Sequence, residues 1–363
     1  MTEADRGGGG FLREPLPTPA AWDGTELTGS DDWVIELSPA QAAELAAAGA
    51  AARRATDGDV PFAVTRRDFP LPTVAGLCDD IAGRLEGGRG VVLLRGFPVA
   101  EHADTELELL LWGLGTHLGA AEPQDRDGLL LHRVQDTGRD IGDGDVRYFQ
   151  TSRDLTFHND GADVFMLLCV RTAARGGRSR IVSSVAAFNR IVREAPDLAV
   201  VLQQPFHFDL RGQQPAGAPR VQTVPIFNFH RGRLCTLYKR QYIDSAQRFA
   251  EVPTLSSEQR AALDLLDAVC DELALEFAMH PGDVLVANNY DVLHARSAFA
   301  DAGGGAGRLM LRLWLSLPGG RPLPPAFAGT REFRHSYARH RAWDKAARKQ
   351  GAARKQGAAQ QRI

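Results

Sequence analysis

The clearest hydrophobic pattern of the chain lies in residues 308–317. Every odd position from 309 to 317 is leucine, and the even positions carry Arg308, Met310, Arg312, Trp314 and Ser316. This alternation predicts a strand with two different faces, because successive side chains of a strand point to opposite sides. A face with two arginines beside Met310 and Trp314 favours the lining of a ligand-binding barrel over a solvent surface.

Turn residues separate further apolar runs, and most of the chain from 157 to 318 is predicted to form strands. The expected strands cover residues 91–94, 164–170, 179–184, 206–210, 221–229, 234–237 and 284–287. Helices are expected over residues 38–52, 72–85, 105–114 and 185–193, and after Ser256. The pattern indicates an α+β, mainly β fold.

The two ends differ in composition from the middle of the chain. Residues 1–20 are rich in Gly and Pro and are expected to form a flexible arm. Residues 331–363 are basic and contain a near-repeat, and they are expected to be disordered or a fraying helix. Residues 21–330 would then form a single domain. The polar stretch 120–150 is either a lid over the site or a mobile surface loop, and the sequence favours neither.

Charge and composition exclude several classes of protein. The 363 residues carry a formal net charge of -3, which gives no field suited to nucleic acid. The four cysteines are scattered and do not form a zinc ribbon or disulfide framework. No run of about 18 apolar residues suggests a membrane span, and the N-terminus lacks the pattern of a signal peptide. A cytoplasmic enzyme with a small-molecule substrate is expected, and the oligomeric state is left open.

The sequence His-x-Asp occurs three times, beginning at His102, His158 and His207. The copy at His102 precedes a predicted helix, where its Asp suits a helix cap. The copy at His207 alternates with apolar residues, as in a half-buried strand. Only His158-Asn159-Asp160 leads through a glycine into a long apolar strand. Alternate residues of an extended chain share one side, so His158 and Asp160 can face one point.

A metal centre needs a further ligand, and His294 follows the predicted strand 284–287. We expect His158, Asp160 and His294 to hold Fe(II). Two histidines and one carboxylate leave open positions for a co-substrate and O2, as in non-haem Fe(II) oxygenases.

Such an iron needs a two-electron reductant bound beside the oxygen site. If the reductant is a keto-acid, Arg308 suits its distal carboxylate, because guanidinium binds carboxylate through paired hydrogen bonds. The Ser179 hydroxyl would add a neutral donor. Arg312, on the same face as Arg308, would bind a substrate carboxylate or pair with the co-substrate or an internal acid, and both alternatives stay open.

At these residues the chain resembles the TauD/TfdA family of Fe(II)- and 2-oxoglutarate-dependent dioxygenases, including its clavaminate synthase-like branch. The likeness runs from about residue 88 to 318. Residues 90–98 match the N-terminal core strand of the family, and residues 156–161 match its T-F-H-x-D-G motif. Residues 176–179 resemble the G-G-D-T turn, with Arg178 for Asp and Ser179 for Thr. Residues 293–299 resemble the distal H-G-R-x-x-F motif, and residues 308–312 the closing R-x-x-x-R.

The resemblance implies a double-stranded β-helix (jelly-roll) core flanked by helices. It also implies conversion of 2-oxoglutarate to succinate and CO2, coupled to hydroxylation of an unactivated C–H bond. The expected substrate is a small amino acid-like or carboxylate-bearing compound of specialised metabolism. Desaturation, epoxidation or cyclisation would use the same residues. A zinc-type hydrolase and a non-catalytic jelly-roll binding protein are the alternatives from other classes.

Overall fold

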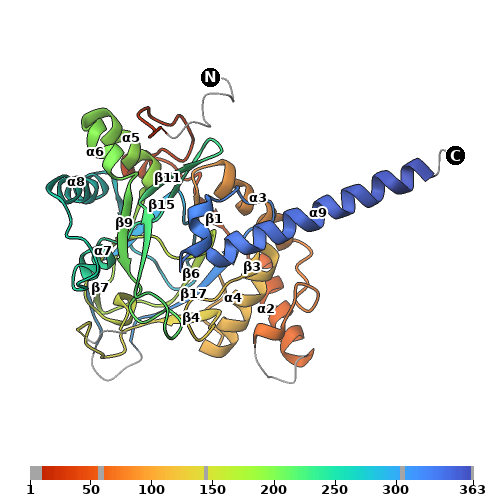
Figure 1. Cartoon of the computed structure of the whole chain (residues 1–363). Coiled ribbons are helices and arrows are strands. Elements are labelled where there is room, and N and C mark those ends of the chain that lie inside the picture. Colours follow the sequence, from red (N-terminus) through yellow and green to blue (C-terminus); the bar gives the residue numbers. More distant parts are fainter. Residues whose placement is uncertain (1–9, 56–60, 143–145, 303–306, 361–363) are drawn as a thin grey trace.

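The computed structural model describes residues 10–55, 61–142, 146–302 and 307–360. Its centre consists of two β-sheets with helices packed outside them (Figure 1). Side chains from both sheets meet in one buried cluster, which includes Phe165, Ile181, Leu285, Val292 and Trp314. The two sheets therefore face each other across a shared interior.

The larger sheet has seven strands in the order β1-β2-β14-β6-β17-β3, and β4 also pairs with β17. All neighbours are antiparallel except β1 and β2. The strands are β1 (Val34–Glu36), β2 (Val91–Arg95), β3 (Ala120–Ala121), β4 (Leu131–Val134), β6 (Val164–Arg171), β14 (Val284–Asn288) and β17 (Leu309–Ser316).

The smaller sheet has four strands in the order β13-β8-β15-β5, all antiparallel. They are β5 (Leu155–His158), β8 (Ser179–Ser183), β13 (Leu275–Phe277) and β15 (Val292–Arg296). Three two-stranded pairs extend the fold: β9 (Pro205–Asp209) with β10 (Val221–Pro225), β11 (Phe227–His230) with β12 (Arg233–Thr236), and β7 (Arg175–Gly176) with β16 (Phe299–Ala300). The strand expected over 221–229 is thus two strands, β10 and β11.

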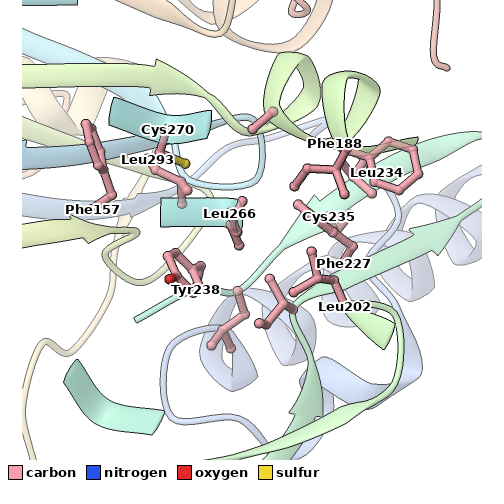
Figure 2. Close-up of a cluster of buried hydrophobic side chains, with 14 of the residues drawn as sticks. Phe157, Phe188, Leu202, Phe227, Leu234, Cys235, Tyr238, Leu266, Cys270 and Leu293 are labelled. Atoms are coloured by element: carbon pink, nitrogen blue, oxygen red, sulfur yellow. The ribbon is translucent and has the colours of Figure 1, made fainter. Parts of the chain in front are cut away.

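Helices cover the outer faces of both sheets. The larger sheet packs against α2 (Pro39–Ala55), α3 (Val74–Gly87) and α4 (Asp104–Leu118). A second cluster joins the smaller sheet to its helices, and Figure 2 shows Phe157 and Leu293 of that sheet beside Leu266 and Cys270 of α8. The helices on this side are α5 (Ser184–Glu194), α6 (Pro196–Val201), α7 (Arg240–Ala246) and α8 (Ser257–Leu273). The short α1 (Gly24–Thr28) contacts β13.

The alternation of β17 has the two faces that its sequence predicts. Its leucines, from Leu309 to Leu315, and Leu317 just after the strand join the cluster under α2, α3 and α4. Met310 and Trp314 point the other way, into the cluster between the sheets. All eight residues of β17 are buried, so its mixed face lines the interior and not the surface.

Parts of both chain ends contact the body of the protein. Residues 1–9 lie outside the described residues, whereas Leu12 and Leu16 exchange backbone hydrogen bonds with the side chains of Gln203 and Asn189. Residues 334–360 form helix α9 (Arg334–Gln360), which projects from the body (Figure 1). Phe333 is fully buried, so the packed body continues past residue 330.

Candidate functional site

Strand pairing brings the two predicted histidine ligands together. His158 ends β5 and lies directly opposite His294 of β15 in the antiparallel register. Their ring centroids are 4.2 Å apart. Asp160 follows β5, and one ligand atom from each of the three residues lies within 4.8 Å of the other two. No other such group of three was found among the described residues.

Hydrogen bonds hold the His158 side chain and the backbone of Asp160. His158 Nδ1 lies 2.9 Å from the carbonyl oxygen of Thr156, which leaves Nε2 to face a metal. Asn289 Oδ1 accepts a hydrogen bond from the backbone N–H of Asp160 at 3.0 Å. The buried Nδ1 of His294 has no hydrogen-bond partner among the described residues.

The protonation states suit a divalent metal. Burial lowers the pKa of His294 to about 4 and that of His158 well below its ordinary value, so both rings are neutral at pH 7. Burial alone would raise the pKa of Asp160, but the nearby positive charge, above all that of Arg312, outweighs this and lowers it. Two neutral imidazoles and one carboxylate are a donor set that fits Fe(II).

Arg312 contacts Asp160 directly. Its Nη1 donates to Asp160 Oδ1 at 2.8 Å and Oδ2 at 3.1 Å, and its Nε donates to Gln124 Oε1 at 2.8 Å. Of the partners considered for Arg312, the structure shows the internal acid, which is Asp160. Its Nη2 is buried and has no hydrogen-bond partner among the described residues.

A first hollow, of about 510 Å³, lies beside His158, Asp160 and His294 and is lined by Ser179 and Arg308. Both residues are almost fully buried. Arg308 Nη1 has no hydrogen-bond partner among the described residues, although a buried guanidinium normally finds an acceptor. Burial lowers the pKa of Arg308. The site therefore offers an unused cation next to the candidate metal ligands.

A second hollow, of about 380 Å³, touches His158, Asp160 and Arg312 and continues to Arg147 and Lys239. Tyr148, Phe149, Gln241 and Tyr242 line it further. The sequence analysis did not identify Arg147 or Lys239, because neither lies in a recognisable motif. The stretch 120–150 contributes Arg147, Tyr148 and Phe149 to the wall, and its role as a lid stays a prediction.

The other His-x-Asp copies lie outside the triad. Asp104 is the first residue of α4 and pairs with Arg171 at 2.6 Å, while the cap position itself is Ala103. Asp209 accepts a hydrogen bond from Ser245. Asn159, between the two candidate ligands His158 and Asp160, is fully buried and bonded to backbone atoms, including the carbonyl oxygen of Asn289. Within the described residues, no helix is long and apolar enough to cross a bilayer.

Two facing sheets with a two-histidine, one-carboxylate cluster between them define a jelly-roll protein with a candidate non-haem iron site. A comparison with protein families matches residues 55–314 to the family described as taurine catabolism dioxygenase TauD, TfdA family. The chain belongs to this family. It is therefore a 2-oxoglutarate-dependent non-haem iron dioxygenase, whose cofactor is Fe(II) and whose co-substrates are 2-oxoglutarate and O2. This excludes the hydrolase and binding-protein alternatives.

Individual relatives agree with this assignment. The chain is 28% identical over 327 residues to FR-33289 synthase of Streptomyces rubellomurinus, covering 88% of this chain and 95% of the relative. It is 27% identical over 313 residues to a taurine hydroxylase-like protein, SAT17, of Stachybotrys chartarum, covering 83% and 80%.

Solved structures share the fold. An asparagine oxygenase in complex with Fe(II), 3-hydroxyasparagine and succinate matches with a TM-score of 0.61 at 19% identity, over 78% of this chain and 93% of that one. The non-haem iron oxygenase OrfP in complex with Fe and α-ketoglutaric acid matches with a TM-score of 0.57 at 20% identity, over the same shares. The predicted double-stranded β-helix core is thus confirmed.

Proposed function

We propose that this protein hydroxylates an unactivated C–H bond of a small amino acid-like or carboxylate-bearing metabolite, with release of succinate and CO2. The observation that supports this most directly is the position of Arg308. It is a buried cation with an unpaired Nη1 in the same hollow as His158, Asp160 and His294. A keto-acid bound to a metal at the triad would have its distal carboxylate within that hollow.

Each residue has a distinct part in this proposal. His158, Asp160 and His294 hold the Fe(II), which together with 2-oxoglutarate supplies the activation of O2. Arg308 binds the distal carboxylate of 2-oxoglutarate, and the buried hydroxyl of Ser179 donates a further hydrogen bond to it. Phe165 packs against the His294 ring, with centroids 4.4 Å apart, and shields that ligand from water.

Hydroxylation is favoured over the alternative outcomes by one relative, since a protein 27% identical is described as taurine hydroxylase-like. Desaturation, epoxidation and cyclisation would use the same residues. The cationic lining of the second hollow supports an anionic substrate, and a carboxylate is the anionic group expected from the sequence.

The test is an anaerobic titration of the purified protein with Fe(II) and then 2-oxoglutarate, followed by visible absorption. A weak charge-transfer band should appear with the native protein and be lost in His158→Ala and Arg308→Ala. Arg178→Gln is the matched control, because Arg178 lies in the same turn as Ser179 but pairs with Glu276 at the surface. The band should be unchanged in this variant.

Two results would contradict the proposal. The first is iron binding without any band on addition of 2-oxoglutarate. The second is a band that survives Arg308→Ala at the same 2-oxoglutarate concentration, because another residue would then hold the distal carboxylate. When the band behaves as expected, succinate release serves as the assay for screening substrates.

A further inference from the structure

The second hollow carries an excess of positive charge. Four buried cations surround it or stand directly behind its wall, and two buried carboxylates face them. The cations are Arg147, Lys239, Arg312 and Arg331, and the carboxylates are Asp160 and Glu332. Fe(II) and 2-oxoglutarate carry opposite charges of equal size, so loading both leaves this excess unchanged. Buried charge of one sign is costly unless a counter-charge arrives.

Arg147 is the member of this group without an acidic partner. No carboxylate among the described residues lies within salt-bridge distance of its guanidinium. Its Nη1 donates to the carbonyl oxygen of Gln124 at 2.9 Å, and its Nε is buried without a hydrogen-bond partner in the described structure. The guanidinium carbon lies over the Phe149 ring, 4.6 Å from its centroid, at the wall of the hollow.

Lys239 stands on the same wall and has donors to spare. Its ammonium donates to Glu332 Oε1 at 2.9 Å, the one hydrogen bond that it makes within the described residues. An ammonium carries three donors, so two are left. The backbones of Lys239 and His158 form an isolated antiparallel β-bridge, which holds Lys239 next to the candidate metal ligands.

Arg312 is less suited to bind an anion, although the sequence suggested it. Two of its three nitrogens already donate to Asp160 and Gln124. Moving it toward a substrate would leave the buried carboxylate of Asp160 without its partner, which is costly. Arg312 keeps one unpaired nitrogen, Nη2, but its guanidinium is committed to Asp160, whereas neither Arg147 nor Lys239 pairs with a candidate metal ligand.

We infer that Arg147 and Lys239 form a binding site for an oxyanion group of the substrate, a carboxylate, sulfonate or phosphonate. The inference rests on the proposed function, since it assigns one end of the molecule that is oxidised. The anion would bind in the second hollow, while Ser179 and Arg308 hold the co-substrate in the first.

The experiment uses the full chain loaded with Mn(II), which takes the same ligands and relaxes protons of molecules bound near it. With 2-oxoglutarate saturating, the probes are butyrate, propane-1-sulfonate, propylphosphonate and the neutral butyramide. Each anion is expected to bind at least about tenfold more tightly than butyramide, as the gain of a charge-assisted hydrogen bond predicts. The order among the three anions identifies the group that the site prefers.

Variants separate this site from its surroundings. Arg147→Gln should weaken binding of the anions at least about tenfold and leave binding of butyramide unchanged. Arg153→Gln is the control, because the Arg153 side chain belongs to the same segment but is 67% exposed. The variant Lys239→Gln removes the ammonium and leaves Glu332 paired with Arg331 at 3.3 Å and with the Gln222 amide, so no buried charge is left alone. This variant should also weaken binding of the anions.

Relaxation of the 2-oxoglutarate methylene protons is measured first and tests the proposed function separately. A variant that still relaxes these protons has kept its fold and its co-substrate site. Given that signal, the inference is overturned if the anions bind no better than butyramide, including the case in which no probe binds. It is equally overturned if Arg147→Gln binds the anions as tightly as the native protein.

Discussion

Arg312 donates from a single guanidinium nitrogen to both oxygens of Asp160, at 2.8 and 3.1 Å. Both side chains are 4% exposed. The pair connects β17 of the larger sheet to the segment that follows β5 of the smaller sheet. Strand β17 therefore fixes a candidate metal ligand, while Arg308, just before it, lines the first hollow.

Arg312→Gln should weaken divalent metal binding about 10- to 100-fold, the usual cost of removing a partner that orients a ligand. Without Arg312 the Asp160 carboxylate loses its fixed orientation. The measurement is the dissociation constant for Mn(II) or Co(II), with Arg178→Gln as the control. Unchanged or tighter metal binding would show that charge repulsion by Arg312 outweighs its positioning of Asp160.

Gly161→Ala should destabilise the protein by about 1–3 kcal/mol, the range for overpacking a buried position. An added Cβ would lie 2.4 Å from Trp314 Cζ3 and 2.8 Å from the carbonyl oxygen of Glu332. The paired control is Gly83→Ala in α3, where a Cβ meets nothing within 4 Å. That change should stabilise the protein by about 0.5–1 kcal/mol. Urea unfolding of both variants checks the opposite signs.

Truncation should locate the end of the packed body. A chain that ends at Gly329 lacks Phe333, which is fully buried, and leaves the buried Lys239 without Glu332. It should lose cooperative unfolding. A chain that ends at Lys345 removes, among the residues with described side chains, only exposed ones and should unfold within about 0.5 kcal/mol of the full chain. A stable, cooperative Gly329 variant would contradict this boundary.

The anchor of helix α9 should respond to pH. His340 Nε2 lies 2.7 Å from Oδ2 of the buried Asp163. Burial lowers the pKa of His340, but the hydrogen bond and attraction of Asp163 outweigh it and raise the pKa above the ordinary value. A raised pKa means that the stabilisation is complete below the unfolded pKa of about 6.5 and disappears as pH rises through the folded value.

Consequently, the native protein should exceed His340→Gln in unfolding free energy by about 1.5–3 kcal/mol at pH 6, as for a hydrogen bond to a charged group. The difference should shrink at pH 8.5. Urea unfolding of both proteins at the two pH values gives this difference directly, because other titrating groups cancel. A difference that grows with pH would mean that His340 is neutral in the folded protein.

Short-range patterns were the part of the fold that could be read from the sequence. The alternation of β17 determines both of its faces, and the spacing of His158 and Asp160 places them together without knowledge of the rest of the chain. The leucine face of β17 packs under the helices, as an apolar face of a strand requires.

Contacts between distant segments could not be read in the same way. Arg147 lies in a polar stretch with no periodicity, and Lys239 follows β12 with no motif around it. They share a hollow only because the strands place both segments beside β5. The burial of Phe333 was not predicted, because a single apolar residue in a basic segment gives no hydrophobic pattern. The roles of Ser179, Arg308 and the three ligands stay predictions until the variants are measured.

The facing pair of His158 and His294 has a consequence for how the protein matures. The two residues belong to strands far apart in the chain, and they meet only when β5 and β15 have paired. Such non-local pairing forms late compared with helices and hairpins, because a long loop must first close. A complete iron site cannot exist on the nascent or partly folded chain. Binding of a metal by all three candidate ligands therefore requires that β5 and β15 have already paired.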